Sequence, residues 1–410
     1  MTQAAGFPAP HGGALEGVQV IEWGSGRASA YAGRLLSGLG ARVVLVERNE
    51  ARRERAFPAD PVANRPRQVA ALTRFLHGGK LSVELDPGSR QGHADLLSLC
   101  RSADIVVVDQ PVAAVEALDL APETVAAACP RAIVVATTLA GLAAGARHLR
   151  YSDLAAHAIS GMAWGTPGRV PNPETYPPLK PGGYQADYTL GLAAASSALL
   201  GLQLRRRTGA GQLFDVSAQA VLASYLRMDV AFRTYEAGEA MTVSGFNRQS
   251  PNGREPTLWG LVPCKDGYFA FQASEQYQWE GLMRAMGDPE WSKEPRFQDP
   301  TERGLLWDEI EPHFVGWSMQ HNKAEIFHAA QANHVPVFPC FNVEELLNDP
   351  QQEARGFFVD LPLEEDHALV RVPGAIVHLE KTPLQHLAAP PLVGQHTREI
   401  LQALRNEASV

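Results

Sequence analysis

Short runs of apolar, mostly β-branched residues alternate with segments of helical pattern through the first half of the chain. The runs are VQVIEW (18–23), RVVLVE (42–47), KLSVEL (80–85), DIVVVD (104–109) and AIVVATT (132–138). Between them, segments such as SAYAGRLLSGLG and SRQGHADLLSLCRSA place apolar residues at helical spacing. Continuous apolar strands that alternate with helices are typical of a parallel sheet covered on both faces. The pattern therefore predicts a doubly wound α/β domain.

The pattern changes after residue 150. Residues 161–187 are dense in proline and glycine, and loops of such length inside compact domains are usually functional or disordered. The next segment, 188–207, is rich in small residues and basic at its end, which predicts a closely packed helix whose last turn complements its dipole. Residues 212–226 are expected to continue as a strand and a helix.

Residues 245–340 differ again, with turn and hairpin signals at SPNG and KDGYFAF. Helical stretches are expected at 276–287 and 323–333, so we interpret this region as a smaller α+β domain. The tail is too short and too mixed to form a domain alone, and we expect it to pack back onto the first domain. The predicted division is a large domain at 1–225, a small domain at 245–335, and a C-terminal segment, 345–410, that completes the large domain.

Composition supports a folded globular protein of 410 residues, 45% of them hydrophobic. The net charge is −9 and the pI is about 5.8, so no global basic field favours nucleic acid or an anionic membrane surface. The 4 cysteines form no C-x-x-C pair and fit a reducing cytosol. No targeting segment and no membrane-spanning run is recognised, so we expect a cytoplasmic protein.

The first strand leads directly into Gly24-Ser25-Gly26 and then into a helical segment. Such a turn lets the backbone approach a phosphate, and the free N–H groups at the helix start attract an anion. Ser29 replaces the third glycine of the dinucleotide fingerprint, while Glu47 stands near the position of the acidic residue that binds a ribose hydroxyl. A nicotinamide or flavin site, a site for another phosphate ligand, and a merely structural turn all remain open.

An arginine-rich segment follows the second strand. Arginine suits phosphate because its planar guanidinium makes paired, charge-assisted hydrogen bonds. We expect most of these side chains to form a solvated loop. One or two at the strand end are candidates to contact an adenosine phosphate, and a ligand with a 3′-phosphate would suit them better than NAD. The segment contains Arg48, Arg52, Arg53, Arg55, Arg65 and Arg67.

Common catalytic motifs do not occur in the sequence: there is no G-x-S-x-G elbow, H-E-x-x-H helix, P-loop or Cys/His cluster, and no metal site is predicted. His157 is interpreted as a hydrogen-bonded core residue, and Asp153 as a helix cap or loop-fixing group. Asp187 is open to two interpretations. Aspartate commonly caps a helix that begins after such a loop, but a carboxylate shielded from water there can also attack an acyl group.

These segments together resemble the family III CoA-transferases, the CaiB/BaiF family, of which formyl-CoA transferase and carnitine CoA-transferase are members. The similarity runs along nearly the whole chain. The matching segments are, in order, LEGVQVIEWGSGRASAYAGRLLSGLGARVVLVER, KLSVELDPGSRQG, ADIVVVD, YSDLAAHAISGMAWGTPG, ADYTLGLAAASSALLGLQLRRRTGAGQLFDVS, CKDGYFAF, NDPQQEARGFF and PPLVGQHTREIL.

The resemblance implies a Rossmann-like large domain built from both chain ends, a small inserted domain and an interlocked homodimer. It implies transfer of coenzyme A from an acyl-CoA to a small carboxylic acid, with no tightly bound cofactor. Asp187 would attack the thioester to give a mixed anhydride, which the CoA thiolate converts to an aspartyl-CoA thioester. The acceptor carboxylate would then take the CoA through a second anhydride. The segment KPGG before Asp187 would help to exclude water.

The resemblance also implies which residues meet coenzyme A. Arg48 matches the family arginine that contacts the nucleotide phosphate. Arg27 and Ala28 occupy the helix start near the reacting thioester. Leu85 and Asp86 fall where the end of the third strand lines the adenine pocket.

Three alternatives compete with this interpretation. α-Methylacyl-CoA racemases share the scaffold but pair a histidine with the aspartate, and this chain has Ser152 at the matching place. A non-catalytic acyl-CoA-binding subunit would account for missing basic residues, such as the family arginine replaced by Ala117, but the retained Asp187 argues against it. A nicotinamide oxidoreductase lacks a recognisable hydride-transfer site downstream.

Overall fold

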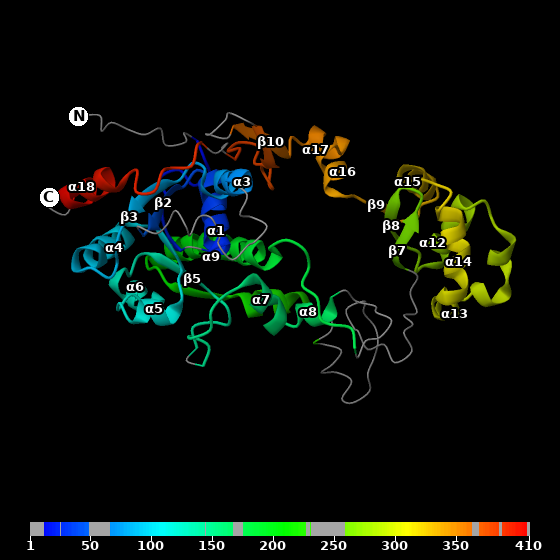
Figure 1. Cartoon of the computed structure of the whole chain (residues 1–410), viewed down its shortest axis with the longest axis horizontal. Coiled ribbons are helices and arrows are strands. Elements are labelled where there is room, and N and C mark those ends of the chain that lie inside the picture. The colour runs from blue at the N-terminus through cyan, green and yellow to red at the C-terminus, as the bar shows by residue number, and fades with distance from the viewer. Residues whose placement is uncertain are drawn as a thin grey trace. The chain divides into compact units, whose positions relative to one another are not determined.

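The computed structural model describes residues 12–24, 26–48, 66–143, 145–166, 175–226, 230, 259–362, 369–384 and 388–407. The chain forms two compact units (Figure 1). The first contains Met1–Ala163, Lys180–Leu226 and Glu353–Val410, and the second contains Trp164–Leu179 and Arg227–Gln352. The first unit therefore combines segments from both ends of the chain.

The first unit is built on a six-stranded parallel sheet with the strand order β3-β2-β1-β4-β5-β6. The apolar runs predicted as strands form β1 to β5, and all residues of β5 are buried. The prediction of a doubly wound parallel α/β sheet is confirmed, and the strand order is that of a Rossmann-like fold. The strands are β1 Gln19–Gly24, β2 Arg42–Glu47, β3 Leu81–Glu84, β4 Ile105–Asp109, β5 Ile133–Thr138 and β6 Leu213–Ser217.

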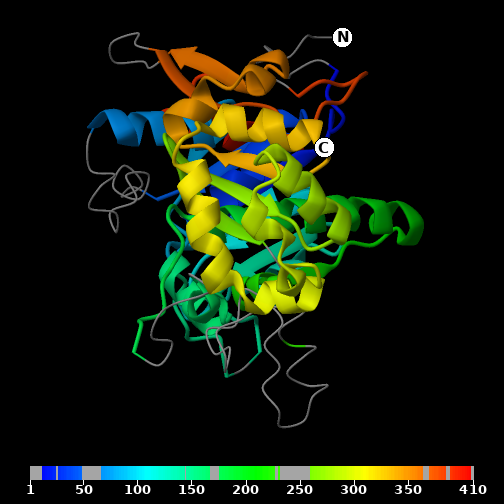
Figure 2. The same ribbon diagram turned by 90° about the vertical axis from the view of Figure 1, so that its right-hand side faces the viewer.

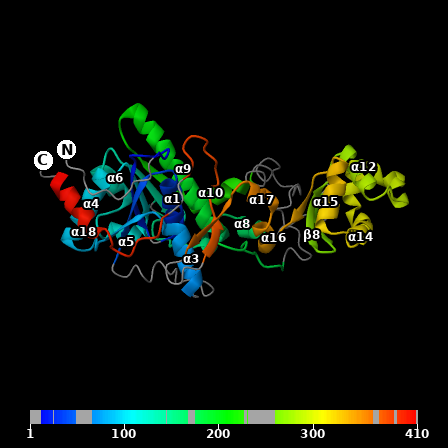
Figure 3. The ribbon, with the colours of Figure 1, turned by 90° about the horizontal axis from the view of Figure 1, so that it is seen from above.

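Helices cover both faces of this sheet (Figures 1 and 3). Successive strand residues enter two apolar clusters, so that Val20 packs with α1 and α9 while Ile21 packs with α4 and α18. The first layer contains α1 Arg27–Gly38, α7 Asp153–Ile159, α9 Gln185–Thr208 and α10 Ala218–Ala223, and α3 Pro66–His77 lies against α1. The opposite layer contains α4 Arg90–Ser102, α5 Val112–Glu116, α6 Pro122–Ala128 and α18 Thr397–Glu407.

The small residues of α9 allow it to pack closely against α1. A Cβ atom on Gly191 would lie 2.5 Å from the carbonyl oxygen of Ala28, so only glycine fits there. The helix begins at Gln185, three residues before the predicted start. It ends at Thr208, and Gly209 follows in the left-handed conformation with φ 77°.

The chain from Glu353 onward belongs to the first unit but adds no strand to its six-stranded sheet within the described residues. It forms an antiparallel hairpin of β10 Phe358–Pro362 and β11 Leu369–Pro373, and then α18, which packs against α4 and β3. The N–H group of Ser82 donates to Nδ1 of His396 over 3.1 Å. This bond ties the end of the chain to β3.

The second unit contains an antiparallel three-stranded sheet in the order β7-β8-β9, covered on one side by helices (Figure 2). Phe269, Phe271 and Phe314 pack in its core. The helices predicted at 276–287 and 323–333 are confirmed as α12 and α15. The elements are β7 Trp259–Cys264, β8 Gly267–Gln272, β9 Val337–Cys340, α12 Gln276–Ala285, α13 Pro300–Leu305, α14 Trp307–Ser318, α15 Lys323–Ala332 and α16 Val343–Leu347. SPNG lies outside the described residues.

Candidate active site

The candidate site lies in the first unit, where β1 and β4 end side by side. The strand order reverses between these two strands, and open α/β sheets bind ligands outside the carboxyl ends of strands at such a switch point. Gly24 and Asp109, the last residues of β1 and β4, are paired in register. The first turn of α1 follows directly, and the first turn of α9 contacts it. The elements that the site requires therefore meet at one edge of the sheet.

The glycine turn that resembles a dinucleotide fingerprint is occupied by a side chain of the protein itself. The N–H group of Ser29 donates to Oδ2 of Asp109 over 3.3 Å. A Cβ atom on Gly26 would lie 2.3 Å from the same oxygen, so glycine is needed for the carboxylate to fit. Burial raises the pKa of Asp109, and the bonds from Ser29 oppose that rise. A protein carboxylate therefore takes the position in which dinucleotide-binding proteins hold a phosphate.

Glu47, the residue considered for a ribose hydroxyl, is buried at the end of β2. Its carboxylate accepts a hydrogen bond from the hydroxyl of Ser82 on the neighbouring strand β3. Together with Asp109, this arrangement favours a structural or non-dinucleotide interpretation of the opening turn.

Asp187 lies inside the first turn of α9 and is only 3% exposed. The interpretation of Asp187 as the helix cap is wrong, because Tyr184 precedes the first helical residue and no side chain caps the helix from that position. Instead, Oδ1 of Asp153 accepts the N–H group of Ala186 over 2.9 Å. Asp153 thus holds the start of α9 from another helix, which confirms its predicted role as a cap or loop-fixing group.

The two carboxylate oxygens of Asp187 have different partners. The hydroxyl of Tyr151 donates to Oδ1 over 2.6 Å, and Nη1 of Arg27 lies 3.5 Å from Oδ2. Burial raises the pKa of Asp187 to about 6, and the neighbouring carboxylates of Asp153 and Asp109 add to the rise, while Tyr151 and Arg27 oppose it. At neutral pH the group is therefore an anion with little solvation, which is a reactive form of a carboxylate.

A lysine anchors the segment KPGG that leads into α9. Nζ of Lys180 lies 2.7 Å from Oδ2 of Asp153 and donates to the carbonyl oxygens of Pro181 and Gly183. The ring of Tyr184 lies under Arg27, with 3.6 Å between the guanidinium carbon and the ring centroid. This stack fixes Arg27 where it meets Asp187.

The long loop expected at 161–187 is shorter than its sequence pattern indicated, because its first residues form the helix α8 Met162–Gly165.

His157 is buried in α7, and its Nδ1 lies 2.9 Å from the carbonyl oxygen of Asp153. The prediction of a hydrogen-bonded core residue is confirmed. Ser152 caps α7, because its hydroxyl accepts the N–H group of Ala155 over 3.1 Å. The position at which racemases carry a histidine therefore has a helix cap in this protein.

The residues expected to contact coenzyme A all lie at the carboxyl edge of the sheet. Arg27 contacts Asp187, and Ala28 is buried beside it. Arg48 is exposed directly after β2, and the N–H group of Leu85 donates to the carbonyl oxygen of Glu47 over 2.8 Å. Asp86 is exposed next to Leu85. Four further arginines of the basic segment, Arg52, Arg53, Arg55 and Arg65, lie outside the described residues, as does the side chain of Arg67.

Tyr151, Lys180 and Asp109 belong to the site but were not predicted as parts of it. Asp109 had a signal in the sequence, since it is an acidic residue that ends a buried strand beside the glycine turn. Lys180 stands next to the glycine pair that it anchors. Tyr151 carried no local signal, because only the tertiary fold brings it to Asp187, 36 residues away in the sequence.

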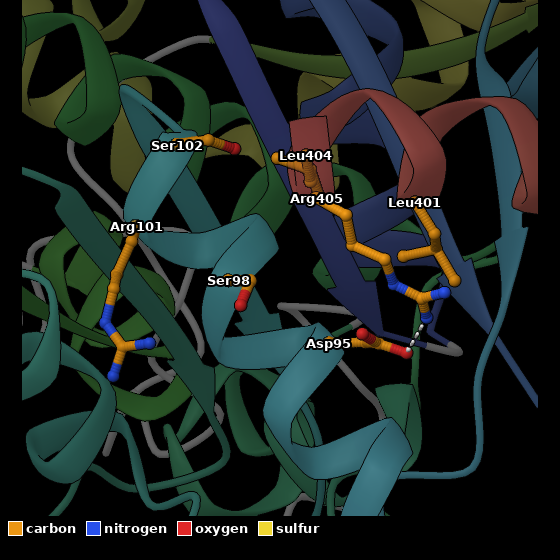
Figure 4. Close-up of a pocket in the computed structure, with 7 residues that line it drawn as sticks. All are labelled: Asp95, Ser98, Arg101, Ser102, Leu401, Leu404 and Arg405. Atoms are coloured by element: carbon orange, nitrogen blue, oxygen red, sulfur yellow. Dashed lines mark hydrogen bonds and ion pairs between the residues drawn. The ribbon is translucent and has the colours of Figure 1, made fainter. Parts of the chain in front are cut away.

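A separate surface groove lies between α4 and α18, where Arg405 reaches towards Asp95 with 3.5 Å between Nη2 and Oδ2 (Figure 4). Leu401 and Leu404 of this groove belong to the apolar cluster on the face opposite α1 and α9. The groove is therefore remote from Asp187. Its lining residues are Asp95, Ser98, Arg101, Ser102, Leu401, Leu404 and Arg405.

Two further properties concern only the part of the chain that the structure describes. No group of three or more His, Cys, Asp or Glu side chains there is placed to hold a metal ion. None of its helices has both the length and the apolar character needed to cross a bilayer.

Comparison with known proteins identifies similar proteins along nearly the whole chain. A model of CoA-transferase family III matches residues 15–397. Succinate–glutarate CoA-transferase of Agrobacterium fabrum is 26% identical over 399 residues, which cover 95% of each chain. Formyl-CoA:oxalate CoA-transferase of Streptomyces coelicolor is 24% identical, with 94% of each chain covered. The crystal structure of a CaiB/BaiF family protein from Brucella suis has the same fold, with a TM-score of 0.78, 23% identity, and coverage of 96% of this chain and 100% of that chain.

Proposed function

Because this chain belongs to CoA-transferase family III, we propose that it transfers coenzyme A from an acyl-CoA to a carboxylic acid through covalent intermediates on Asp187. The relatives that it resembles carry names of CoA-transferases acting on succinate, glutarate, formyl-CoA and oxalate. Short carboxylic acids are therefore the first substrates to consider.

In the proposed reaction Asp187 attacks the acyl carbon of the donor thioester. A C–O bond forms, the C–S bond breaks, and CoA leaves as a thiolate. The thiolate then attacks the aspartyl carbonyl and expels the acyl group as a carboxylate, which leaves an aspartyl-CoA thioester. An acceptor carboxylate repeats the two steps in reverse, so one thioester is exchanged for another and Asp187 is regenerated.

The observation that carries this proposal is the state of the Asp187 carboxylate. It is buried, its pKa is raised to about 6, and among the described residues Tyr151 donates a hydrogen bond to one oxygen while Arg27 lies near the other. Such a group is ionised at pH 7 to 8 and shielded from the water that would hydrolyse an anhydride. The anchored segment KPGG supports the same shielding.

Coenzyme A is proposed to bind along the carboxyl edge of the sheet as a substrate, not as a tightly held cofactor. Arg27 and Ala28 would face the thioester, and Arg48 would meet a nucleotide phosphate with its exposed guanidinium. Leu85 and Asp86 would border the adenine. Their common position at the ends of β1, β2 and β3 supports this placement.

A homodimer is part of the proposal, because the first unit exposes apolar side chains on neighbouring helices. Leu192 and Leu200 of α9 are 44% and 54% exposed, and Leu154 of α7 is 62% exposed. Such side chains gathered on packed helices favour an interface, and light scattering of the purified chain measures its mass directly. A cytoplasmic location is also proposed, supported by cysteines that are all unpaired.

The test uses the full chain with a panel of acyl-CoA donors, including succinyl-CoA, glutaryl-CoA and formyl-CoA, and dicarboxylate acceptors. Asp187→Ala is expected to reduce CoA transfer at least ~1000-fold and to leave no hydroxylamine-trapped or CoA adduct by intact mass. Asp95→Ala, on the opposite face of the sheet, serves as the matched control and should retain activity.

The alternatives predict different outcomes. A binding subunit would give no adduct with any donor while still binding CoA thioesters. A racemase would exchange the α-proton of a branched acyl-CoA without forming an adduct, and the capping role of Ser152 disfavours it. Full transfer activity in Asp187→Ala would overturn the proposed mechanism.

A further inference from the structure

The contacts of Asp187 distinguish its two oxygens. Oδ1 accepts a short hydrogen bond of 2.6 Å from the hydroxyl of Tyr151, whereas Oδ2 faces Nη1 of Arg27 at 3.5 Å. The bond to Oδ1 comes from a neutral donor with good geometry, and the contact at Oδ2 is a looser ion pair. Separating Oδ2 from Arg27 therefore costs less free energy than breaking the bond between Oδ1 and Tyr151, so Oδ2 is the oxygen available for attack.

Tyr151 is held firmly in this place. It stands two residues before α7, and its ring packs against the same apolar cluster that buries Ala156, Leu190 and Ala194. Burial raises the pKa of the Tyr151 hydroxyl, and the charge of Asp187 raises it further. The hydroxyl thus keeps its proton and acts towards Asp187 only as a donor.

Resting on the proposed function, we propose that Tyr151 is a catalytic residue of this enzyme: Asp187 attacks through Oδ2, while the Tyr151 hydroxyl stays bonded to Oδ1 and stabilises the negative charge that forms there. The role follows from the contacts of Tyr151 in this protein and names a group beyond Asp187 itself. Preorganised donors aimed at an oxygen that gains charge are among the largest contributions to catalysis.

The charge appears in a defined step. When the CoA thiolate attacks the aspartyl carbonyl of the mixed anhydride, a C–S bond forms and the π electrons of the C=O bond move onto Oδ1. The tetrahedral intermediate collapses when the C=O bond re-forms and the bond from the aspartyl carbon to Oδ2 breaks, so that Oδ2 leaves with the acyl carboxylate. Tyr151 donates one hydrogen bond throughout and loses no proton, so atoms and electrons balance without a further reactant.

The experiment compares Tyr151→Phe with the wild type, because this change removes only the hydroxyl. After mixing with an acyl-CoA and no acceptor, rapid quench and intact mass follow the appearance of the CoA adduct on Asp187. We expect the adduct to form about 100-fold more slowly in Tyr151→Phe at pH 8.5. Tyr225→Phe, which removes a phenol that is 53% exposed on the same unit, is the matched control and should match the wild type.

The pH profile separates this role from a purely structural one. Loss of the hydrogen bond also moves the pKa of Asp187 upward, since that bond lowers it. A loss that persists at pH 8.5, together with an acid limb moved to higher pH and an unchanged far-UV circular dichroism spectrum, supports the proposal. Recovery of the full rate at pH 8.5 would overturn it, because the hydroxyl would then act only on the ionisation of Asp187.

Failure of this proposal and failure of the proposed function give different results. If the wild type forms the adduct and Tyr151→Phe forms it equally fast, only the role of Tyr151 is wrong. If the wild type forms no adduct with any donor, both proposals are overturned. Should Tyr151→Phe fold poorly, 3-fluorotyrosine at position 151 keeps the ring and strengthens the donor, and a rate below that of the wild type would contradict the proposal.

Discussion

Two pairs of a carboxylate and a cation lie beside helix α1, and they differ in burial and in the distance between their charged atoms. Glu22 on β1 and Lys80 before β3 are fully buried, with 2.6 Å between Oε2 and Nζ. Arg27, at the start of α1, and Asp187, in the first turn of α9, have 3.5 Å between Nη1 and Oδ2, and 10% and 5% of their side chains are exposed. Burial raises the pKa of both carboxylates, and in each pair the neighbouring cation opposes that rise.

The difference between the pairs shows that burial alone does not make a carboxylate reactive. Nζ of Lys80 also donates to the carbonyl oxygen of Ala30 over 2.8 Å, so the cation is fixed between strand and helix. Glu22 is therefore held in a closed structural pair. Asp187 shares its charge between a phenol and a looser guanidinium at the ligand-binding edge of the sheet, so one oxygen can leave its partner and meet a substrate.

The largest effect on stability is expected from breaking the closed pair. Lys80→Met keeps most of the side-chain volume but leaves the Glu22 carboxylate without its neutralising charge. Removing one partner of a buried pair typically costs about 3–5 kcal/mol. Chemical denaturation of the purified chain at pH 7.5 should reveal a loss of this size in the free energy of unfolding.

The double variant Glu22→Met/Lys80→Met serves as the control for that loss. Replacing both charges by unbranched apolar side chains should recover most of the stability, since such replacements are often neutral. The loss in the single variant should also be smaller at pH 5, because an uncompensated Glu22 then more readily takes a proton. A single variant as stable as the wild type would mean that the pair has no structural role.

An intermediate effect is expected when the charge of Asp187 is removed. The folded-state pKa of about 6 lies above the ordinary value of 3.8. The stability linked to this group is thus fully present below about pH 4 and is lost as the pH rises through 6. Asp187→Asn has no carboxylate to ionise and does not lose this stability. The free energy of unfolding of the variant, relative to that of the wild type, should therefore increase by about 2–3 kcal/mol between pH 4 and pH 8.

Denaturation curves of both proteins at several pH values measure this difference. The absolute stability of Asp187→Asn also depends on how the new amide meets Arg27 and Tyr151, but the change with pH isolates the ionisation. A difference that stays constant from pH 4 to pH 8 would contradict the raised pKa and, with it, the view that the nucleophile is strained by its surroundings.

Much of the first unit was predictable from the sequence because the strands β1 to β5 are largely buried on both faces. Strands of this kind read as continuous apolar runs, and β1 to β5 were located in this way. The hairpin of β10 and β11 was not predicted, since each of these strands is five residues long and has only one buried residue, which leaves no apolar run in the sequence. Helix α14 was also missed, and it contains Pro312, which breaks a helical sequence pattern.

Only part of the site was predictable from the sequence, because some of its contacts join residues that are far apart in the chain. Asp187 was singled out by its position after the long loop and by similarity to a family, Arg27 by that similarity, and the structure places them in contact. The role of Asp153 at the start of α9 followed from residue type. The bond from Tyr151 and the bond from Ser29 to Asp109 cross 36 and 80 residues of sequence, and such contacts leave no local pattern.

The smallest effect is expected when the loose pair is weakened without removal of the nucleophile. Arg27→Gln removes the positive charge near Oδ2 of Asp187 but keeps a polar side chain able to lie against Tyr184. Because Arg27 lowers the pKa of Asp187, its loss should raise that pKa by up to about one unit. The acid limb of CoA transfer should move to higher pH, with about a fivefold loss at pH 6 and little change at pH 8 from this cause. Steady-state kcat and KM for the donor across this pH range measure the shift, with Arg205→Gln at the far end of α9 as the matched control. A loss in kcat that is equal at pH 6 and pH 8 would contradict this effect of Arg27 on the pKa of Asp187, whereas a rise in KM for the donor at both pH values would reflect the proposed contact of Arg27 with the CoA thioester.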